Sequence, residues 1–261
     1  MRSFRAKPVG WRGESHRHYL AAKGISSTYY SKKGKLMHKL DFKQVRGKSW
    51  VEEATDSKGR IVRKYPDEFK DKQATNKFSR VLKLEKKFPA VVKKISVDVA
   101  TKNGGELQNA QAAYVIAKTG LRPGTEKDTK ADVHAFGVTT LEDRHVKGSG
   151  RHVRLVFTGK KGVKIDKKIE DAKVAKILLQ RKRAPGKQLF TEVNEGSLLK
   201  YVQSRGIKKT KDLRTVRANI LAKQYKKQGL ENKEIVQRVA DDLGNTPAVA
   251  KGSYINPKVL T

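Results

Sequence analysis

Cysteine is absent from the 261-residue sequence, which excludes disulfide bonds, thiolate metal ligands and cysteine nucleophiles. No apolar run approaches the ~18 residues that a membrane-spanning helix needs. The opening segment, MRSFRAKPVG, is basic and lacks the apolar core of a signal peptide. The phosphate-binding pattern GxxxxGK[ST] is also missing, so nucleotide hydrolysis is not expected. The sequence therefore predicts a soluble, cytoplasmic protein that works without a nucleotide cofactor.

Acidic residues are scarce. Only 26 Asp and Glu stand against 60 Lys and Arg, which gives a formal net charge of +34. A chain this positive repels itself unless it binds a polyanion, and nucleic acid is the most common one. Hydrophobic residues make up 36% of the chain, enough for a folded core. Charge alone does not define an activity, because a basic ribosomal or chromatin-like protein has the same balance.

Metal-binding patterns are missing as well. The six histidines do not combine with acidic residues at ligand spacing, and the carboxylates show no paired motif of a two-metal nuclease. We therefore expect no metal and no cofactor of any other kind.

The first part of the chain has the pattern of short strands followed by a helix. SSTYYSKKGKLMH and KSWVEEATDSKGRIVRKY predict strands broken by KKGK and SKGR turns. Pro66 then starts a helix with acidic residues in its first turn, and Pro89 starts a separate helix, PAVVKKISVDVATK. We place a domain boundary within this helical region. This predicts a β-rich N-terminal domain over residues 1–76 and a catalytic domain over residues 77–261.

The second part is predicted to be mainly helical. ELQNAQAAYVIAKTG keeps helical spacing and stops at Gly120. FGVTTL, residues 136–141, is typical of a strand, and RHVRLVFTGKKGVKIDKKI predicts a hairpin by its alternation. Four further helices are expected in EDAKVAKILLQRKR, EGSLLKYVQSR, KDLRTVRANILAKQYKKQG and ENKEIVQRVADDLG, followed by a short loop or turn. The fold class is α+β: a small β-rich domain and a mainly α-helical domain with a small hairpin.

Four local features are candidates for chemistry, and each also has an ordinary structural interpretation. Arg122 follows a helix end in TGLRPGT, and Lys160 lies at the hairpin tip FTGKKG. Arg214 in KDLRT is placed at a helix start, where backbone N–H groups favour phosphate, and Tyr254 lies in KGSYINP. Taken singly, the four residues fit a solvated loop arginine, a turn lysine, a helix-surface arginine and a core tyrosine better than a catalytic role.

Taken in order, these motifs resemble the active site of type IB DNA topoisomerases. The resemblance rests on TGLRPGTEKD, FGVTTLEDRHV, VFTGKKG, KDLRT and LGNTPAVAKGSYINP, and it runs over residues 107–257. It extends weakly into TDSKGRIVRKYPDEF, which is similar to the N-terminal DNA-contacting turn of the short bacterial and viral, poxvirus-like enzymes. It implies a catalytic core of the kind shared by topoisomerases IB and tyrosine recombinases.

The resemblance implies relaxation of supercoiled duplex DNA without ATP or metal. Tyr254 would be the nucleophile that forms a 3′-phosphotyrosyl ester. Arg122 and Arg214 would hold the non-bridging phosphate oxygens, and Lys160 would protonate the leaving 5′-oxygen. Asn245 in LGNTP takes the place of the histidine of poxvirus and eukaryotic enzymes, so it would donate a hydrogen bond without carrying charge. It is equally placed to cap the helix that ends at Gly244.

The expected partner is double-stranded DNA, held by a monomeric clamp through its phosphates. Candidate DNA contacts are Arg60, Arg63, Tyr65 and Lys161, which are also consistent with solvated surface residues. The main alternative is a tyrosine recombinase. Recombinases usually carry a histidine where this sequence has Lys211, and they have a C-terminal exchange helix, for which the seven residues after Tyr254 are too few. A non-catalytic basic binding protein is the third possibility.

Overall fold

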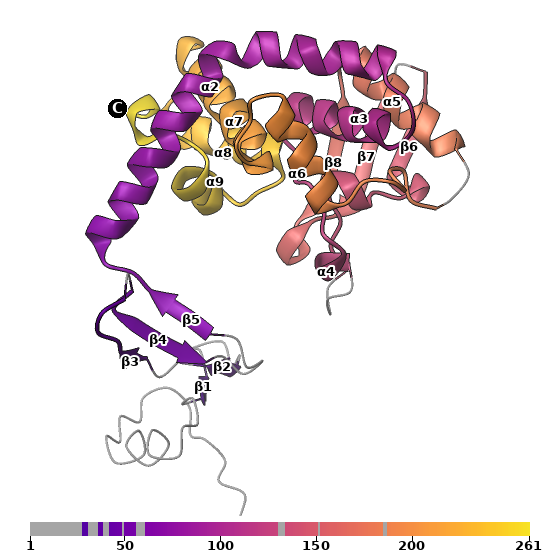
Figure 1. Cartoon of the computed structure of the whole chain (residues 1–261). Coiled ribbons are helices and arrows are strands. Elements are labelled where there is room, and N and C mark those ends of the chain that lie inside the picture. The colour runs from indigo at the N-terminus through magenta and orange to yellow at the C-terminus, as the bar shows by residue number, and fades with distance from the viewer. Residues whose placement is uncertain are drawn as a thin grey trace, which may run out of the picture. The chain divides into compact units, whose positions relative to one another are not determined.

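The chain divides into two units, Met1–Lys77 and Phe78–Thr261, in a computed structural model (Figure 1). The structure describes residues 28–30, 36–38, 42–48, 50–55, 61–129, 134–150, 152–184 and 187–261, the backbone alone for 28–30, 36–38, 127, 128 and 161. Each unit is considered by itself. The fold is α+β, with helices as the main element of the second unit.

The first unit contains short antiparallel strands, as the sequence predicts. Strand β1 (Thr28–Tyr30) pairs with β2 (Leu36–His38). Strands β3 (Lys43–Gln44), β4 (Glu52–Thr55) and β5 (Ile61–Lys64) form a three-stranded sheet in that order. Both expected strand pairs are therefore confirmed, with the additional strand β3 at the edge.

Helix α2 (Asp67–Thr101) is a single helix, so the separate helix expected after Pro89 is wrong. Pro89 removes one backbone donor, but it lies on the exposed side of the helix. Phe88, Val91 and Ile95 continue the buried stripe on both sides of the proline. Burying this stripe offsets the local cost of proline, ~3 kcal/mol in a helix interior.

Helix α3 (Gly104–Thr119) lies at the centre of the second unit, because every residue from 108 to 117 is buried. It ends as predicted at Gly120, which has a left-handed φ of 70° and donates its N–H to the carbonyl of Ile116. The other helices of this unit are α4 (Glu126–Thr129), α5 (Ala172–Arg183), α6 (Glu195–Ser204), α7 (Thr210–Lys227), α8 (Asn232–Leu243) and α9 (Pro247–Ser253).

A three-stranded antiparallel sheet completes the second unit. Its strands are β6 (Val146–Ser149), β7 (His152–Thr158) and β8 (Lys164–Ile169). The β7–β8 hairpin is confirmed, and its alternation buries Val153, Leu155 and Phe157. Strand β6 was not expected.

Two further segments differ from the sequence prediction. Residues 136–141 are not a strand: they contain a 3₁₀ helix, Val138–Thr140. The hydroxyl of Thr140 accepts from the N–H of Gly137 within the segment, whereas Thr139 bonds to Gly124 and so makes a tertiary contact with the Arg122 loop. The segment before Tyr254, expected as a loop or turn, contains helix α9, which is capped by the side chain of Thr246.

Candidate active site

The loop that carries Arg122 is fixed by the 3₁₀ helix beside it. The carbonyl of Arg122 accepts the N–H of Val138 at 2.7 Å, and the N–H of Gly124 donates to Thr139 Oγ1 at 2.9 Å. A Cβ atom on Gly137 would lie 2.2 Å from the carbonyl oxygen of Pro123. The FGVTTL motif therefore acts as a backbone brace for the arginine loop.

Arg214 lies in the second turn of α7 and not at a helix start, because the helix begins at Thr210. The argument from free N–H groups at a helix start is therefore wrong for this residue. Its side chain is 1% exposed. Nη2 donates to the carbonyl of Leu243 at 2.6 Å, while Nε and Nη1 are buried without a hydrogen-bond partner among the described residues. Two guanidinium donors are thus left for an acceptor.

Burial and neighbouring charges change the pKa of Arg214. Burial lowers the pKa of Arg214 to about 10; Tyr254 opposes this shift, and the positive charge of Arg122 adds to it. The guanidinium stays protonated at neutral pH, and Arg122 is near enough to interact with it electrostatically. Two arginine cations side by side favour the binding of an anion between them.

Helix α7 is anchored to α2 by an ion pair that the sequence did not reveal. Asp212, 3% exposed, accepts two hydrogen bonds from Arg80, at 2.8 Å from Nε and 3.0 Å from Nη2. This bidentate pair fixes the first turn of α7 and therefore the start of the helix that presents Arg214.

Tyr254 follows α9 as its C-terminal cap and is 2% exposed. The centroid of its ring lies 4.9 Å from Cζ of Arg214 and 4.9 Å from Nζ of Lys211. The ring packs in the core cluster shared by α7, α8 and α9. Tyr254 is therefore both a core residue and a neighbour of two cations, so its role in packing does not exclude a role as nucleophile.

Asn219 holds the backbone around Tyr254, a role that the sequence did not indicate. The residue is 1% exposed on α7. Its Nδ2 donates to the carbonyl of Tyr254 at 2.9 Å and to that of Thr215 at 2.7 Å, and its Oδ1 accepts the N–H of Asn256 at 2.8 Å. The available signal was an asparagine in the apolar helical run ANILA, where its helix propensity is poor.

Asn245 lies in the turn after α8. Gly244 is the C-cap of that helix, with a left-handed φ of 60°, and the N–H of Asn245 donates to the carbonyl of Ala240 at 2.8 Å. The backbone of Asn245 thus helps to cap the C-terminal end of α8, which agrees with the capping role considered for this residue. Its side-chain Nδ2 is buried and has no partner within the described part of the chain, so it is an additional open donor.

Lys160 is exposed at the hairpin tip, in the 3₁₀ turn Lys160–Gly162. The hairpin packs against the Asn245 turn through Ile165. A Cβ on Gly159 would lie 2.8 Å from Ile165 Cδ1, and a Cβ on Gly244 would lie 2.7 Å from the same atom. The structure therefore brings Arg122, Arg214 and Tyr254 together and sets the turns that carry Asn245 and Lys160 against each other.

The N-terminal candidates are placed only in part. Arg60 and the side chain of Lys161 lie outside the described residues. Arg63 is exposed on β5, with its Cζ 4.3 Å from the centroid of the Trp50 ring. Tyr65 stacks on Phe69 with ring centroids 4.9 Å apart. Arg63 also pairs with Glu53 at 3.7 Å, and Tyr65 takes part in an aromatic cluster, so both side chains have contacts within the first unit.

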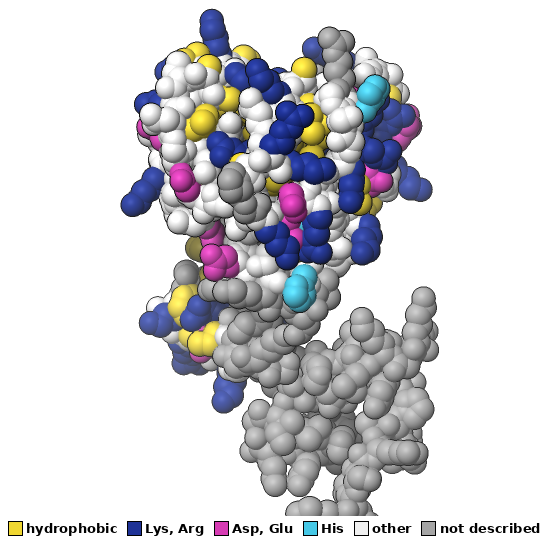
Figure 2. Space-filling model, turned by 90° about the vertical axis from the view of Figure 1, so that its right-hand side faces the viewer, with side chains coloured by type: hydrophobic (Ala, Val, Ile, Leu, Met, Phe, Trp, Pro, Cys, Tyr) yellow, Lys and Arg dark blue, Asp and Glu magenta, His cyan; other side chains and the backbone are white. Residues whose placement is uncertain are grey.

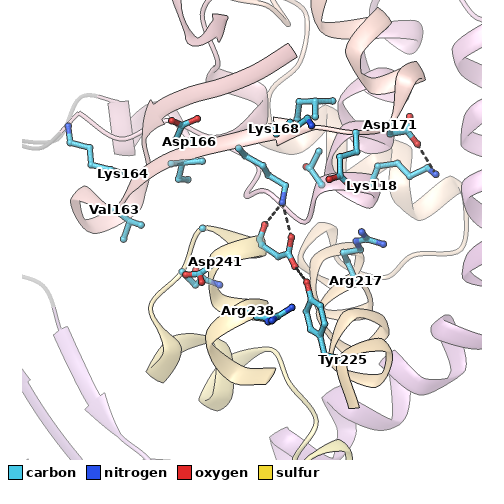
Figure 3. Close-up of a pocket in the computed structure, with 18 residues that line it drawn as sticks. Lys118, Val163, Lys164, Asp166, Lys168, Asp171, Arg217, Tyr225, Arg238 and Asp241 are labelled. Atoms are coloured by element: carbon cyan, nitrogen blue, oxygen red, sulfur yellow. Dashed lines mark hydrogen bonds and ion pairs between the residues drawn. The ribbon is translucent and has the colours of Figure 1, made fainter. Parts of the chain in front are cut away.

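A cavity of about 960 Å³ lies in the second unit, between β8 and helices α7 and α8 (Figure 3). Gly244 and Asn245 line it, but Arg122, Lys160, Arg214 and Tyr254 do not. Among the described residues, no group of three His, Asp or Glu side chains is arranged to hold a metal ion, and no helix is long and apolar enough to cross a membrane.

Comparison with known proteins identifies the family. The family described as "Eukaryotic DNA topoisomerase I, catalytic core" matches residues 66–251, and the chain belongs to this family. No protein with a curated description matches the sequence. Among solved structures, the chain is similar to the XerH site-specific recombinase bound to difH substrate in a pre-cleavage complex, with 12% identity and a TM-score of 0.43. The similarity covers 93% of this chain and 62% of the recombinase chain, so this chain spans less than two thirds of that protein.

Proposed function

We propose that the protein is a type IB DNA topoisomerase, which relaxes supercoiled duplex DNA by cutting and resealing one strand. The observation that carries this proposal is the buried Arg214, which lies beside the Tyr254 ring, interacts electrostatically with Arg122 and has two guanidinium donors without a partner among the described residues. A buried arginine with open donors next to a hydroxyl nucleophile is suited to a phosphodiester, and the chain belongs to a topoisomerase family.

The reaction is a reversible transesterification. The phenol oxygen of Tyr254 attacks the scissile phosphorus and loses its proton to water, while the bond from phosphorus to the 5′-oxygen breaks. Arg122, Arg214 and the amide of Asn245 hold the non-bridging oxygens as negative charge develops on them. Lys160 gives its proton to the departing 5′-oxygen. The cut strand swivels, and the 5′-hydroxyl then attacks the 3′-phosphotyrosyl ester and restores both groups, so neither ATP nor a metal is consumed.

Access to the nucleophile requires a local movement. Tyr254 is 2% exposed, and Lys211 and Arg214 cover its ring. Helix α9, which precedes the tyrosine, has only seven residues, and its first residues, Pro247 and Ala248, are exposed. We propose that DNA binding displaces α9 enough for the phenol oxygen to reach the phosphate between the two arginines.

The proposed partner is double-stranded DNA, bound mainly through phosphates. The chain carries a net charge of +34. Figure 2 shows Lys and Arg side chains spread widely over one face of the described part, with Asp and Glu scattered among them. We propose a monomeric clamp that acts on cytoplasmic DNA and whose affinity falls steeply with salt concentration, because each phosphate contact releases a counterion.

A plasmid assay tests the proposal. The protein should relax supercoiled plasmid in EDTA without ATP, and detergent should trap it covalently on DNA. Tyr254→Phe should abolish both results, whereas Tyr201→Phe, at a tyrosine 6% exposed in α6, should abolish neither. A lack of relaxation would refute the topoisomerase proposal. Joining of two marked duplexes in discrete tetramers would indicate a recombinase instead.

A further inference from the structure

The cavity beside the candidate active site is lined by charged groups from four elements. Lys118 comes from the end of α3, Lys167 from β8, Arg217 from α7 and Asp242 from α8, and Asn245 follows α8. Figure 3 shows Arg217 between the Lys118–Asp171 pair and Tyr225. Its volume, about 960 Å³, is within the range of small-molecule sites and far exceeds the space of a few waters.

Three of the cations that line this cavity already have a carboxylate partner. Lys118 pairs with Asp171 at 2.9 Å. Lys167 donates to Asp242 Oδ1 at 3.1 Å, and the other oxygen of Asp242 accepts the hydroxyl of Tyr225 at 2.6 Å. Arg238 pairs with Glu234 at 2.8 Å. These acidic groups are therefore occupied within the protein and do not neutralise a further cation.

Arg217 differs from these cations. Its Nε is buried and has no hydrogen-bond partner among the residues that the structure describes. Its Cγ would lie 3.4 Å from a Cβ on Gly120, so the side chain passes close to the end of α3. Among the described residues that line the cavity, the other buried donor without a hydrogen-bond partner is Asn245 Nδ2. An acceptor is needed to satisfy these two donors, and one that carries negative charge would also balance the Arg217 cation.

We infer that this cavity is a binding site for a phosphate group that accepts hydrogen bonds from Arg217 and Asn245. The site is separate from the position between Arg214 and Tyr254, because neither of those residues lines the cavity. The phosphate belongs either to the DNA backbone or to a free polyphosphate such as a nucleotide. Asn245 is shared with the proposed cleavage site, so a free polyphosphate would compete with the scissile phosphate for its amide and slow cleavage. This effect on cleavage rests on the proposed function, whereas the binding of phosphate does not.

Binding is tested without DNA and without any activity assay. Tripolyphosphate is titrated into the full chain at constant ionic strength, and binding is followed by calorimetry and by the melting temperature. Arg217→Gln should weaken binding at least ~10-fold, since a charge-assisted hydrogen bond is lost. Arg238→Gln is the matched control, because Arg238 lines the same cavity but pairs with Glu234. Equal affinity of both variants and wild type would overturn the inference.

A second arm distinguishes the two sources of phosphate. If the ligand is the DNA backbone, Arg217→Gln should weaken affinity for a short duplex, and tripolyphosphate should compete with that duplex. If it is a free polyphosphate, duplex affinity should be unchanged, and tripolyphosphate should slow single-turnover cleavage by wild type but not by Arg217→Gln. Arg217→Lys, which keeps the charge, should retain part of the binding if Arg217→Gln does not fold. Equal tripolyphosphate affinity of the variants and wild type refutes the site, while failure of cleavage alone refutes only the proposed function.

Discussion

Replacing Asn219 by alanine should separate the position of the nucleophile from the stability of the fold. The substitution removes three hydrogen bonds and leaves the Tyr254 carbonyl and the Asn256 N–H without their side-chain partner. Both residues are buried, at 2% and 6% exposure. An unsatisfied buried polar group costs about 1–3 kcal/mol, so two of them should lower the free energy of unfolding by about 2–6 kcal/mol. For a unit of this size, at about 2–4 °C per kcal/mol, this corresponds to a melting temperature lower by about 4–24 °C.

The effect on cleavage should exceed what the lost stability explains. Asn219 ties Tyr254 to the helix that carries Arg214, and a displacement of about 1 Å at a reacting atom costs about 10²-fold in rate. Single-turnover cleavage, measured well below the melting temperature, should therefore fall about 10²-fold while duplex affinity stays unchanged.

Asn109 provides the matched control for this experiment. It is also a buried helical asparagine, but its hydrogen bonds go to the Gly105 carbonyl and the Ser197 hydroxyl, neither of which belongs to a candidate site residue. Asn109→Ala should lower the melting temperature and leave the cleavage rate intact. If both variants lower the cleavage rate equally, or if Asn219→Ala cleaves at the wild-type rate, the positioning argument is refuted.

Three other predictions concern the groups around the phosphate. Lys160→Ala should be slow on ordinary DNA but recover on a substrate with a 5′-bridging sulfur, whose leaving group needs no proton; absence of rescue in single-turnover cleavage removes the general-acid role. Asn245→His should keep substantial relaxation activity, because either side chain can donate the hydrogen bond; complete loss in the plasmid assay would point to a structural role. Arg214 acts as a cation with a pKa lowered to about 10, so cleavage at subsaturating DNA should decline as pH rises through about 10. Saturating DNA should move this decline to higher pH, since a bound anion favours the charged form. The DNA affinity of Tyr254→Phe, measured at each pH, corrects for the effect of lysine titration on binding. An unchanged cleavage rate at pH 10.5 contradicts the prediction.

Features that depend on local patterns could be predicted from the sequence. Gly120 ends α3 because glycine adopts the left-handed conformation, and the apolar alternation of residues 153–157 defines β7. The ordered motifs also indicated Arg122, Arg214 and Tyr254, which the structure places together. Their catalytic roles, and those of Lys160 and Asn245, stay predictions.

Features that depend on distant contacts could not be predicted in this way. The pattern of residues 136–141 is typical of a strand, but Thr139 bonds to the Arg122 loop and the segment contains a 3₁₀ helix instead. Pro89 indicates a helix start, yet the buried stripe continues through it. Arg80 and Asp212 are 132 positions apart, and nothing in their local sequence reveals their pairing. Asn219 and Arg217 likewise become distinctive only when their neighbours in space are known.

The contact of Ile165 with two glycines has a consequence for how this protein can change in evolution. Its Cδ1 occupies the space that a Cβ would need at Gly159, next to Lys160, and at Gly244, next to Asn245. A larger residue at either glycine requires the Ile165 side chain to move or residue 165 to become smaller, and at Gly244 the left-handed φ adds backbone strain. A smaller residue 165 in turn leaves the other glycine without its neighbour. We therefore expect positions 159, 165 and 244 to co-vary among related sequences, although they belong to two segments far apart in the chain.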